Sequence, residues 1–160
     1  MAEDEVRIEH PNRDKAASKA TKAAVIALLL VSAALVAIVT VGGWSALEGG
    51  KVIQIAYVVL DLVMAFYVTR WSRGVLPLAA ALAVVLLIFA VVSGPAWFDR
   101  DHDGFAQPAL DAGVLGLITL LIVPVQVLLI AFAMRAFQQA WNVEVERPPR
   151  PDLPLAGTPG

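Results

Sequence analysis

Three stretches of this sequence run for about 20 residues or more without a charged side chain, the length that a helix needs to cross a lipid bilayer. They cover residues 23–47, 74–98 and 112–134. A fourth apolar run, residues 52–69, is shorter and contains Asp61. Because every backbone polar group must be hydrogen-bonded inside the hydrocarbon layer, we expect all four runs to be helical.

The sequence therefore predicts an all-α integral membrane protein with four transmembrane helices, at about residues 23–45, 52–71, 75–97 and 109–135. The first two connections are only a few residues long, so neighbouring helices must lie antiparallel, which gives an up-down bundle. A cleaved signal peptide is the alternative for the first run. That run is longer than the apolar core of a signal peptide, and no A-x-A site follows it.

The positively charged residues are unequally distributed over the ends of these runs. Because Lys and Arg are enriched in cytoplasmic loops, the side that carries ten of the twelve is expected to be cytoplasmic, with both termini inside (N-in/C-in). Each Trp lies near the end of a run, where an indole ring anchors a helix at the membrane interface. The ten basic residues are Arg7, Arg13, Lys15, Lys19, Lys22, Arg70, Arg73, Arg135, Arg147 and Arg150, and the expected interface anchors are Trp44, Trp71, Trp97 and Trp141.

Both ends of the chain differ in composition from the apolar runs. Residues 1–14 and 142–160 are expected to be disordered in the cytoplasm, which leaves residues 15–141 as the transmembrane domain. The C-terminal end is rich in Pro and Gly, which do not pack into a core. Its run Pro148-Pro149-Arg150-Pro151 is either part of a plain extended tail or a polyproline ligand for a partner.

The composition excludes several classes of function. With 59% hydrophobic residues and a net charge of −2, the chain has no basic surface for nucleic acid, so its expected partners are the lipid bilayer and another membrane protein or a second copy of itself. It has no Cys, and its two His, His10 and His102, cannot build a zinc or bis-His haem site by themselves, so no such cofactor is expected. The Ala, Val, Arg and Pro bias points to a bacterial cell membrane.

Asp61 is the one acidic residue inside the apolar runs, where a carboxylate costs about 2.5–3.5 kcal/mol to insert. Asp61 precedes Arg70 by nine residues, Gln126 precedes Arg135 by nine, and Ser32 follows Lys22 by ten. At 1.5 Å per residue all three lie at one depth, about 13–15 Å from the cytoplasmic boundary. We expect Ser32, Asp61 and Gln126 to form a hydrogen-bonded polar cluster inside the bundle.

This cluster allows two interpretations. A neutral Asp61 can donate to Gln126 and hold helices together, which suits a structural or accessory subunit of a membrane complex. Alternatively, Asp61 carries a proton or an ion in a small transporter, since intramembrane acids mark such pathways. The chain offers no second intramembrane acid or base as a relay, so the accessory role is the main expectation.

The loop after the third run contains the sequence FDRDHDGF. Its Asp99, Asp101 and Asp103 occupy positions one, three and five of a calcium-loop pattern, and Gly104 occupies the sharp turn at position six. Phe105 would supply the backbone carbonyl of position seven, and Gln107 would act through water at position nine. Over about a dozen residues the segment resembles the calcium loop of the EF-hand family, which implies a weak Ca²⁺ site.

The segment departs from the family at the position that closes the calcium loop. Position twelve is Leu110 where the family has a bidentate Glu, and Asp111 comes one residue too late. Gly94-Pro95 is also expected to end the third helix before the loop. The alternative is an acidic turn. Within it, His102 is the only candidate general base, and without a nearby nucleophile we expect no enzymatic activity.

Overall fold

The computed structural model describes residues 6–100 and 102–148, which are mostly helical. Four helices in this part of the chain are long and apolar enough to cross a membrane. A short strand and a short helix precede them, and a second strand follows. The elements are β1 (Arg7–Glu9), α1 (Pro11–Asp14), α2 (Ala16–Gly42), α3 (Lys51–Thr69), α4 (Val75–Phe98), α5 (Ala112–Gln138) and β2 (Val145–Arg147).

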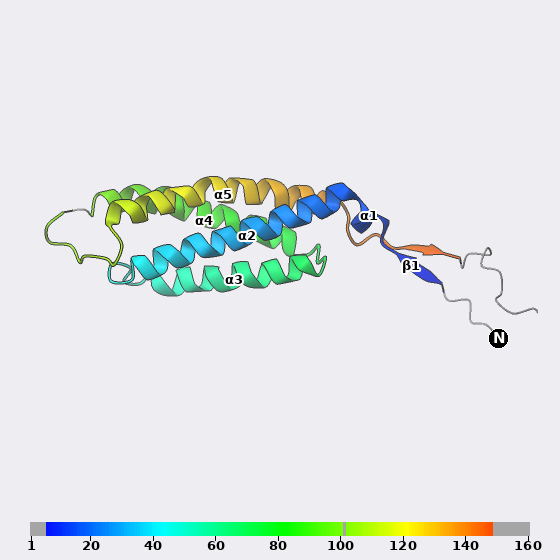
Figure 1. Ribbon diagram of the computed structural model, residues 1–160, viewed down its shortest axis with the longest axis horizontal. Coiled ribbons are helices and arrows are strands. Elements are labelled where there is room, and N and C mark those ends of the chain that lie inside the picture. The colour runs from blue at the N-terminus through cyan, green and yellow to red at the C-terminus, as the bar shows by residue number, and fades with distance from the viewer. Residues whose placement is uncertain (1–5, 101, 149–160) are drawn as a thin grey trace, which may run out of the picture.

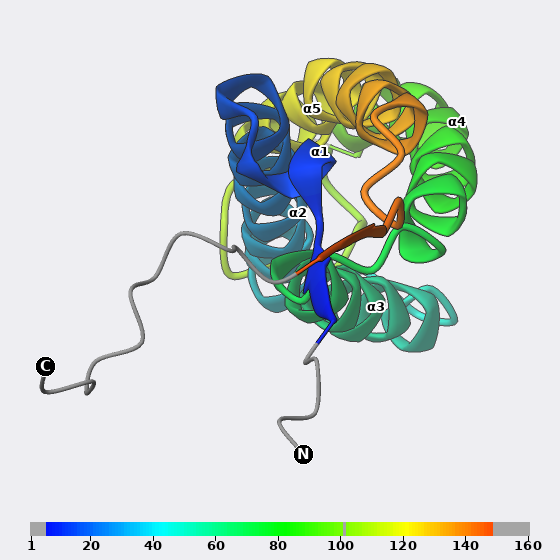
Figure 2. The same cartoon turned by 90° about the vertical axis from the view of Figure 1, so that its right-hand side faces the viewer.

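The four long helices lie side by side, and successive helices run in alternate directions (Figure 1). The bundle therefore has two different ends. We call the end that carries both strands and the α3–α4 connection the terminal end, and the end that carries the connections 43–50 and 99–111 the loop end. Viewed from the terminal end, the helices surround a common axis, with α3 opposite α5 (Figure 2).

The helices are packed unequally around that axis. Helix α5 packs extensively against both α4 and α2, and α2 packs against α3, whereas α3 and α4 touch only sparsely. Small residues bring α4 and α5 together: a Cβ added at Gly94 would lie 2.6 Å from Leu120 Cδ2, and one at Gly116 would lie 2.9 Å from the Phe98 ring. The small residues Ala79 and Ala83 of α4 are likewise buried in the core. The bundle is closed on the α5 side and loose between α3 and α4.

Helix α4 does not end at Gly94-Pro95, as the sequence led us to expect, but continues through Pro95 to Phe98. The missing N–H of Pro95 removes one backbone hydrogen bond near the end of the helix. The close contacts of Gly94 with Leu120 and of Phe98 with Gly116 lie on either side of Pro95. Packing against α5 therefore holds the last turn in helical form.

The ends of the chain are more ordered than expected. Strands β1 and β2 pair antiparallel, with Ile8 opposite Glu146, and Arg147 Nε lies 3.0 Å from a carboxylate oxygen of Glu9. The pairing depends on the bundle, which brings the start of α2 and the end of α5 to the same end. The expectation of disorder is thus wrong for β1, α1 and β2; residues 1–5 and 149–160, with most of the Pro-rich run, lie outside the described residues.

Candidate functional site

The structure brings Ser32, Asp61 and Gln126 together from three helices. Their exposed fractions are 0%, 3% and 1%. The Gln126 side-chain amide donates to Ser32 Oγ at 2.9 Å, and Asp61 lies beside Ser32. Ser32 therefore connects α5 to the one acidic side chain of α3.

One oxygen of this cluster is not accounted for. Asp61 Oδ2 is buried and has no hydrogen-bond partner among the described residues. A buried polar atom without a partner carries a free-energy cost of about 1–3 kcal/mol, and more when it is charged. The arrangement can offset that cost by accepting a proton or a small hydrogen-bond donor at Oδ2.

On the side of the cluster that faces the terminal end, the interior is filled with apolar side chains. Met64 and Val68 follow Asp61 along the inner face of α3 and are 2% and 0% exposed. They belong to a continuous core that ends at the fully buried Trp141. This core, which we call the apolar plug, also contains Val25, Leu29, Ala65, Leu76, Ala79, Ala83, Leu129 and Ala136.

Basic side chains close the terminal end by binding backbone carbonyls where helices finish. Lys22 Nζ donates to the Thr69 carbonyl at 2.7 Å, at the end of α3, and Arg73 Nε donates to the Phe137 carbonyl at 2.8 Å, at the end of α5. A positive charge at a helix C-terminus satisfies unpaired carbonyls and stabilises the helix dipole. These residues, which the sequence assigned to the cytoplasmic boundary, also join the helices to one another.

The four Trp residues do not share one environment. Trp141 is fully buried, meets Trp71 edge to face at 5.1 Å between ring centres, and donates from its indole N–H to Gln139. Trp97 is 5% exposed and lies against Gly43, whereas Trp44 is 49% exposed. The rings of Trp97 and Trp141 therefore pack inside the protein, and the expected role of the four Trp residues as interface anchors stays a prediction.

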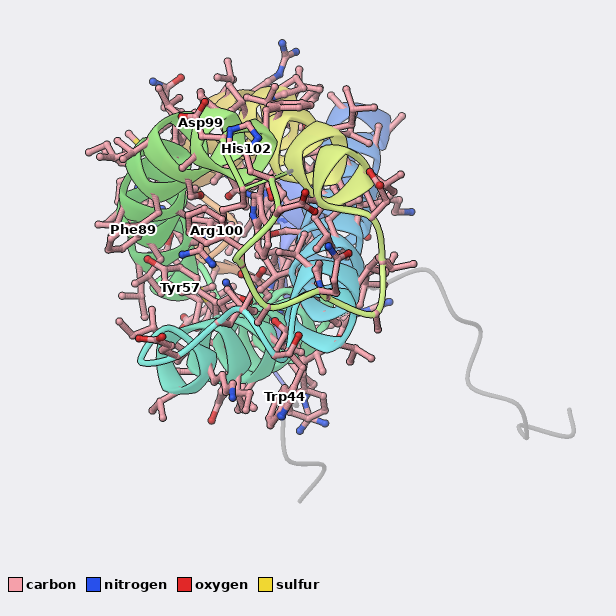
Figure 3. The ribbon with its side chains drawn as sticks, turned by 90° about the vertical axis from the view of Figure 1, so that its left-hand side faces the viewer. Trp44, Tyr57, Phe89, Asp99, Arg100 and His102 are labelled. Carbon is pink, nitrogen blue, oxygen red and sulfur yellow. The ribbon has the colours of Figure 1, made fainter. Side chains whose placement is uncertain are left out.

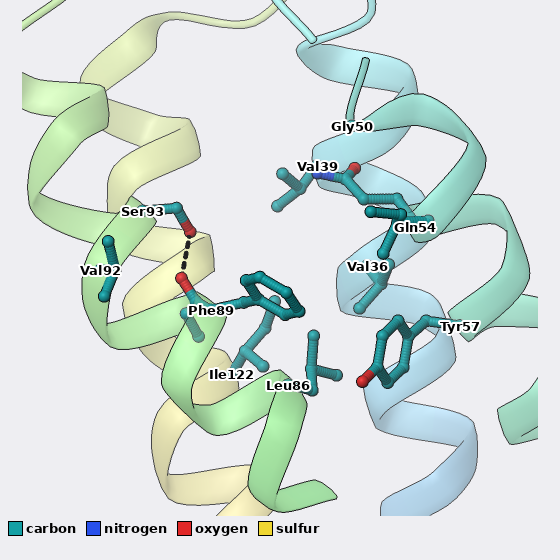
Figure 4. Close-up of a pocket in the computed structure, with 12 residues that line it drawn as sticks. Val36, Val39, Gly50, Gln54, Tyr57, Leu86, Phe89, Val92, Ser93 and Ile122 are labelled. Atoms are coloured by element: carbon teal, nitrogen blue, oxygen red, sulfur yellow. Dashed lines mark hydrogen bonds between the residues drawn. The ribbon is translucent and has the colours of Figure 1, made fainter. Parts of the chain in front are cut away.

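A cavity of about 230 Å³ lies between α3 and α4, on the loop-end side of Asp61 (Figure 4). Its polar groups come from Gln54, Tyr57 and Ser93, and Leu86, Phe89 and Ile122 form apolar walls. It opens at the side of the bundle, because the rim residues Ile53, Phe89 and Val92 are 51%, 50% and 70% exposed.

The polar groups of the cavity are held in place. Gln54 Oε1 accepts a hydrogen bond from Thr40 at 2.7 Å, and Ser93 Oγ donates to the Phe89 carbonyl at 2.7 Å. The Tyr57 hydroxyl donates to the Leu82 carbonyl at 3.4 Å, which is long for a hydrogen bond. Tyr57 is therefore the least firmly held of the three.

A second, smaller cavity, of about 140 Å³, lies next to this one, toward the loop end. The two share Val39, Gln54 and Ser93 as lining residues, and the smaller one extends to Trp97 and Arg100. Arg100 donates to the Ala46 carbonyl at 3.0 Å. Viewed from the loop end, Arg100 and Tyr57 both lie between α4 and α3 (Figure 3).

The expected calcium ligands are not gathered in the part of the loop that the structure describes. Asp99 is the C-terminal cap of α4, and Gly104 adopts a positive φ of 110° in a turn. The Phe105 side chain is 53% exposed, and the Gln107 carbonyl accepts a hydrogen bond from Ser45. Asp101 lies outside the described residues, and among those described no three His, Cys, Asp or Glu side chains, Asp103 included, form a group that could hold a metal ion.

The end of this loop has a structural role. Leu110 donates from its backbone N–H to the Gly42 carbonyl at 3.1 Å, and its side chain lies where a Cβ of Gly42 would be. Asp111 caps α5 by accepting from Gly113 N at 2.8 Å and Val114 N at 3.3 Å. Of the two residues near the closing position of a calcium loop, Leu110 therefore contacts the end of α2 and Asp111 caps the start of α5.

Comparison of the chain with protein-family models, with curated proteins and with solved structures finds no match. The interpretation of the site therefore depends on its own geometry.

Proposed function

We propose that this chain is a multi-pass protein of the bacterial cell membrane with both termini in the cytoplasm. The four apolar helices support membrane insertion, and the basic side chains of Lys22, Arg70 and Arg73 support the orientation, because they lie at the terminal end. Lys51 and Arg100 are the described basic residues at the loop end.

The absence of Cys makes this orientation directly testable. Gly49 and Gly74 lie in connections at opposite ends, and a Cβ added at either meets no atom within 4 Å. We expect a membrane-impermeant maleimide to label Gly49→Cys on intact spheroplasts, and Gly74→Cys only after the membrane is opened. The reverse pattern would overturn the orientation.

We further propose that the protein is an accessory subunit that receives a transmembrane helix of another membrane protein between α3 and α4. One observation carries this proposal: these consecutive helices touch only sparsely, and the cavity between them opens at the side of the bundle. In this proposal the protein is not an enzyme and carries no cofactor.

The chemistry of the opening indicates the kind of partner. Its rim is apolar, as the surface of a membrane helix is, and inside it Gln54 and Ser93 carry polar groups that a bare lipid chain cannot bind. An apolar helix with one polar side chain satisfies both features. Polar contacts of this kind between membrane helices contribute about 0.6–2 kcal/mol each.

Single-cysteine photocrosslinking in native membranes tests the assembly. Ile53→Cys and Val92→Cys, on the two rims of the opening, are expected to crosslink to another membrane protein through a benzophenone maleimide. Val127→Cys on α5, which is 51% exposed, is the matched control and is expected to give lipid adducts only. Lipid adducts alone at all three positions would contradict the accessory role.

A further inference from the structure

We propose that Asp61 is a proton-binding site that exchanges protons with the compartment at the loop end and is closed to the compartment at the terminal end. The inference concerns the bundle by itself, with the opening between α3 and α4 not occupied by a partner helix, and its tests do not require the proposed assembly. It combines three observations: a free carboxylate oxygen, a cavity on one side of it and an apolar plug on the other.

The first observation is the hydrogen bonding of the cluster. Ser32 Oγ accepts from Gln126, which leaves the single hydroxyl proton of Ser32 free to be donated to Asp61. Asp61 Oδ2 has no partner in the described part of the chain. A proton bound at Oδ2 makes the carboxyl group neutral, which removes the cost of burying its charge.

The second observation is the approach from the loop end. The two neighbouring cavities, which share Gln54 and Ser93 as lining residues, extend from Arg100 to Tyr57, which lies on α3 one helical turn before Asp61 (Figures 3 and 4). Residues four apart share one face of a helix, so Tyr57 lies between the cavity and Asp61. Its exposed fraction is 7%, against 3% for Asp61.

Tyr57 can pass a proton without changing its own charge. Its hydroxyl gives its proton to Asp61 Oδ2 and takes another from a hydronium ion in the cavity, which becomes water, so that one proton moves and the phenol is neutral before and after. The long hydrogen bond to the Leu82 carbonyl, at 3.4 Å, leaves this hydroxyl free to turn. Tyr57 is thus a positioning residue for proton exchange at Asp61.

The third observation is the closed side. Between Met64 and Val68 the interior toward the terminal end consists of buried apolar side chains, which offer a proton no group to bind. The buried hydroxyls of Ser18 and Thr21 lie beyond this stretch, at the start of α2. Among the described residues, Ser32 of α2 and Gln126 of α5 face Asp61. On α3, the titratable side chain beside Asp61 is Tyr57. Helix α4 places no charged side chain against Asp61. Protonation of the cluster therefore reports on Asp61 itself.

Infrared spectroscopy of the full chain in oriented proteoliposomes tests the proposal, with orientation assigned by Gly49→Cys labelling. We expect a protonated-carboxyl band, absent from Asp61→Asn, that follows a pH step on the loop side and does not follow one on the terminal side. Tyr57→Phe keeps the apolar lining and is expected to slow the response at least tenfold. A band that follows the terminal side, follows both sides equally or follows neither would overturn the proposal.

A second measurement does not depend on replacing Asp61. In the Cys-free chain, Ser32→Cys places a thiol of similar size in the cluster, and Ag⁺ serves as a small thiol-reactive cation. Ag⁺ added on the loop side is expected to protect this thiol from later maleimide labelling of the denatured protein, whereas Ag⁺ added on the terminal side is not. Val68→Cys, in the apolar plug, is expected to stay unreacted from both sides, and reaction there would contradict a closed terminal half.

Discussion

The two halves of the bundle are built from the same apolar helices but differ in how their polar groups are satisfied. In the terminal half, Lys22 and Arg73 reach inward and bind helix-ending carbonyls, and the space between the helices is filled as far as Trp141. In the loop half, Gln54, Tyr57 and Ser93 face a cavity. Asp61 lies at the boundary with one oxygen unpaired.

The difference indicates that the terminal half stabilises the protein, whereas the loop half has room for a binding site. Close packing and capped helix ends hold α2, α3 and α5 together at the terminal end, so the loop half tolerates empty space and polar side chains. Binding sites need such a region, because a fully packed core leaves no room for a ligand. Substitutions matched between the two halves test this difference.

The largest effect is expected from the two differently placed Trp residues. Trp141→Ala removes a fully buried ring and its contact with Trp71, and is expected to lower the free energy of unfolding by about 3–5 kcal/mol. Trp44→Ala, at the loop end, removes a half-exposed ring and is expected to cost less than about 1 kcal/mol. Denaturation in mixed micelles measures both, and equal losses would mean that the terminal half is not the stabilising one.

An enlarged side chain distinguishes the filled core from the cavity on a single helix. Ala79 and Ala90 are both buried on α4, three turns apart, but Ala79 lies in the apolar plug and Ala90 lines the cavity. Ala79→Val is expected to destabilise by about 1–3 kcal/mol through overpacking, and Ala90→Val by less than about 0.5 kcal/mol. A larger loss at Ala90 in the same unfolding titration would show that the cavity is not free space.

A smaller effect is expected from the basic caps. Lys22→Met keeps the apolar stem but removes the ammonium group from the Thr69 carbonyl, at an expected cost of about 0.5–1 kcal/mol. The control is Lys51→Met, whose ammonium lies 4.8 Å from the Trp44 ring at the loop end and is expected to cost less. Thermal unfolding in detergent measures both losses of stability. A larger loss for Lys51→Met than for Lys22→Met would contradict a stabilising role for the Lys22 cap.

Helix geometry explains why the depth of the polar cluster could be predicted. Ser32, Asp61 and Gln126 were placed at one level by counting residues inward from charged boundaries, and a constant rise per residue makes such counting reliable. The apolar runs also predicted the four helices to within a few residues, and α2 begins at Ala16, seven residues before the expected start of the membrane span.

The remaining features depend on contacts between segments that are distant in the sequence. Pro95 stays helical because its neighbours Gly94 and Phe98 pack against α5. The Trp97 ring packs against Gly43, and the Trp141 ring packs against Trp71. The cavity could not be predicted from the sequence, because it depends on the distance between α3 and α4, which no residue pattern encodes. A stripe of Gln54, Tyr57 and Asp61 at helical spacing was its one signal in the sequence.

The most direct test of the account compares two positions on the inner face of α3. Tyr57 and Met64 lie two helical turns apart on either side of Asp61, with exposed fractions of 7% and 2%. In the Cys-free chain, Tyr57→Cys is expected to react with a small membrane-impermeant thiol reagent from the loop side, and Met64→Cys with none from either side. Reaction of Met64→Cys at a similar rate, or of Tyr57→Cys from the terminal side, would contradict a bundle that is open at one end and closed at the other.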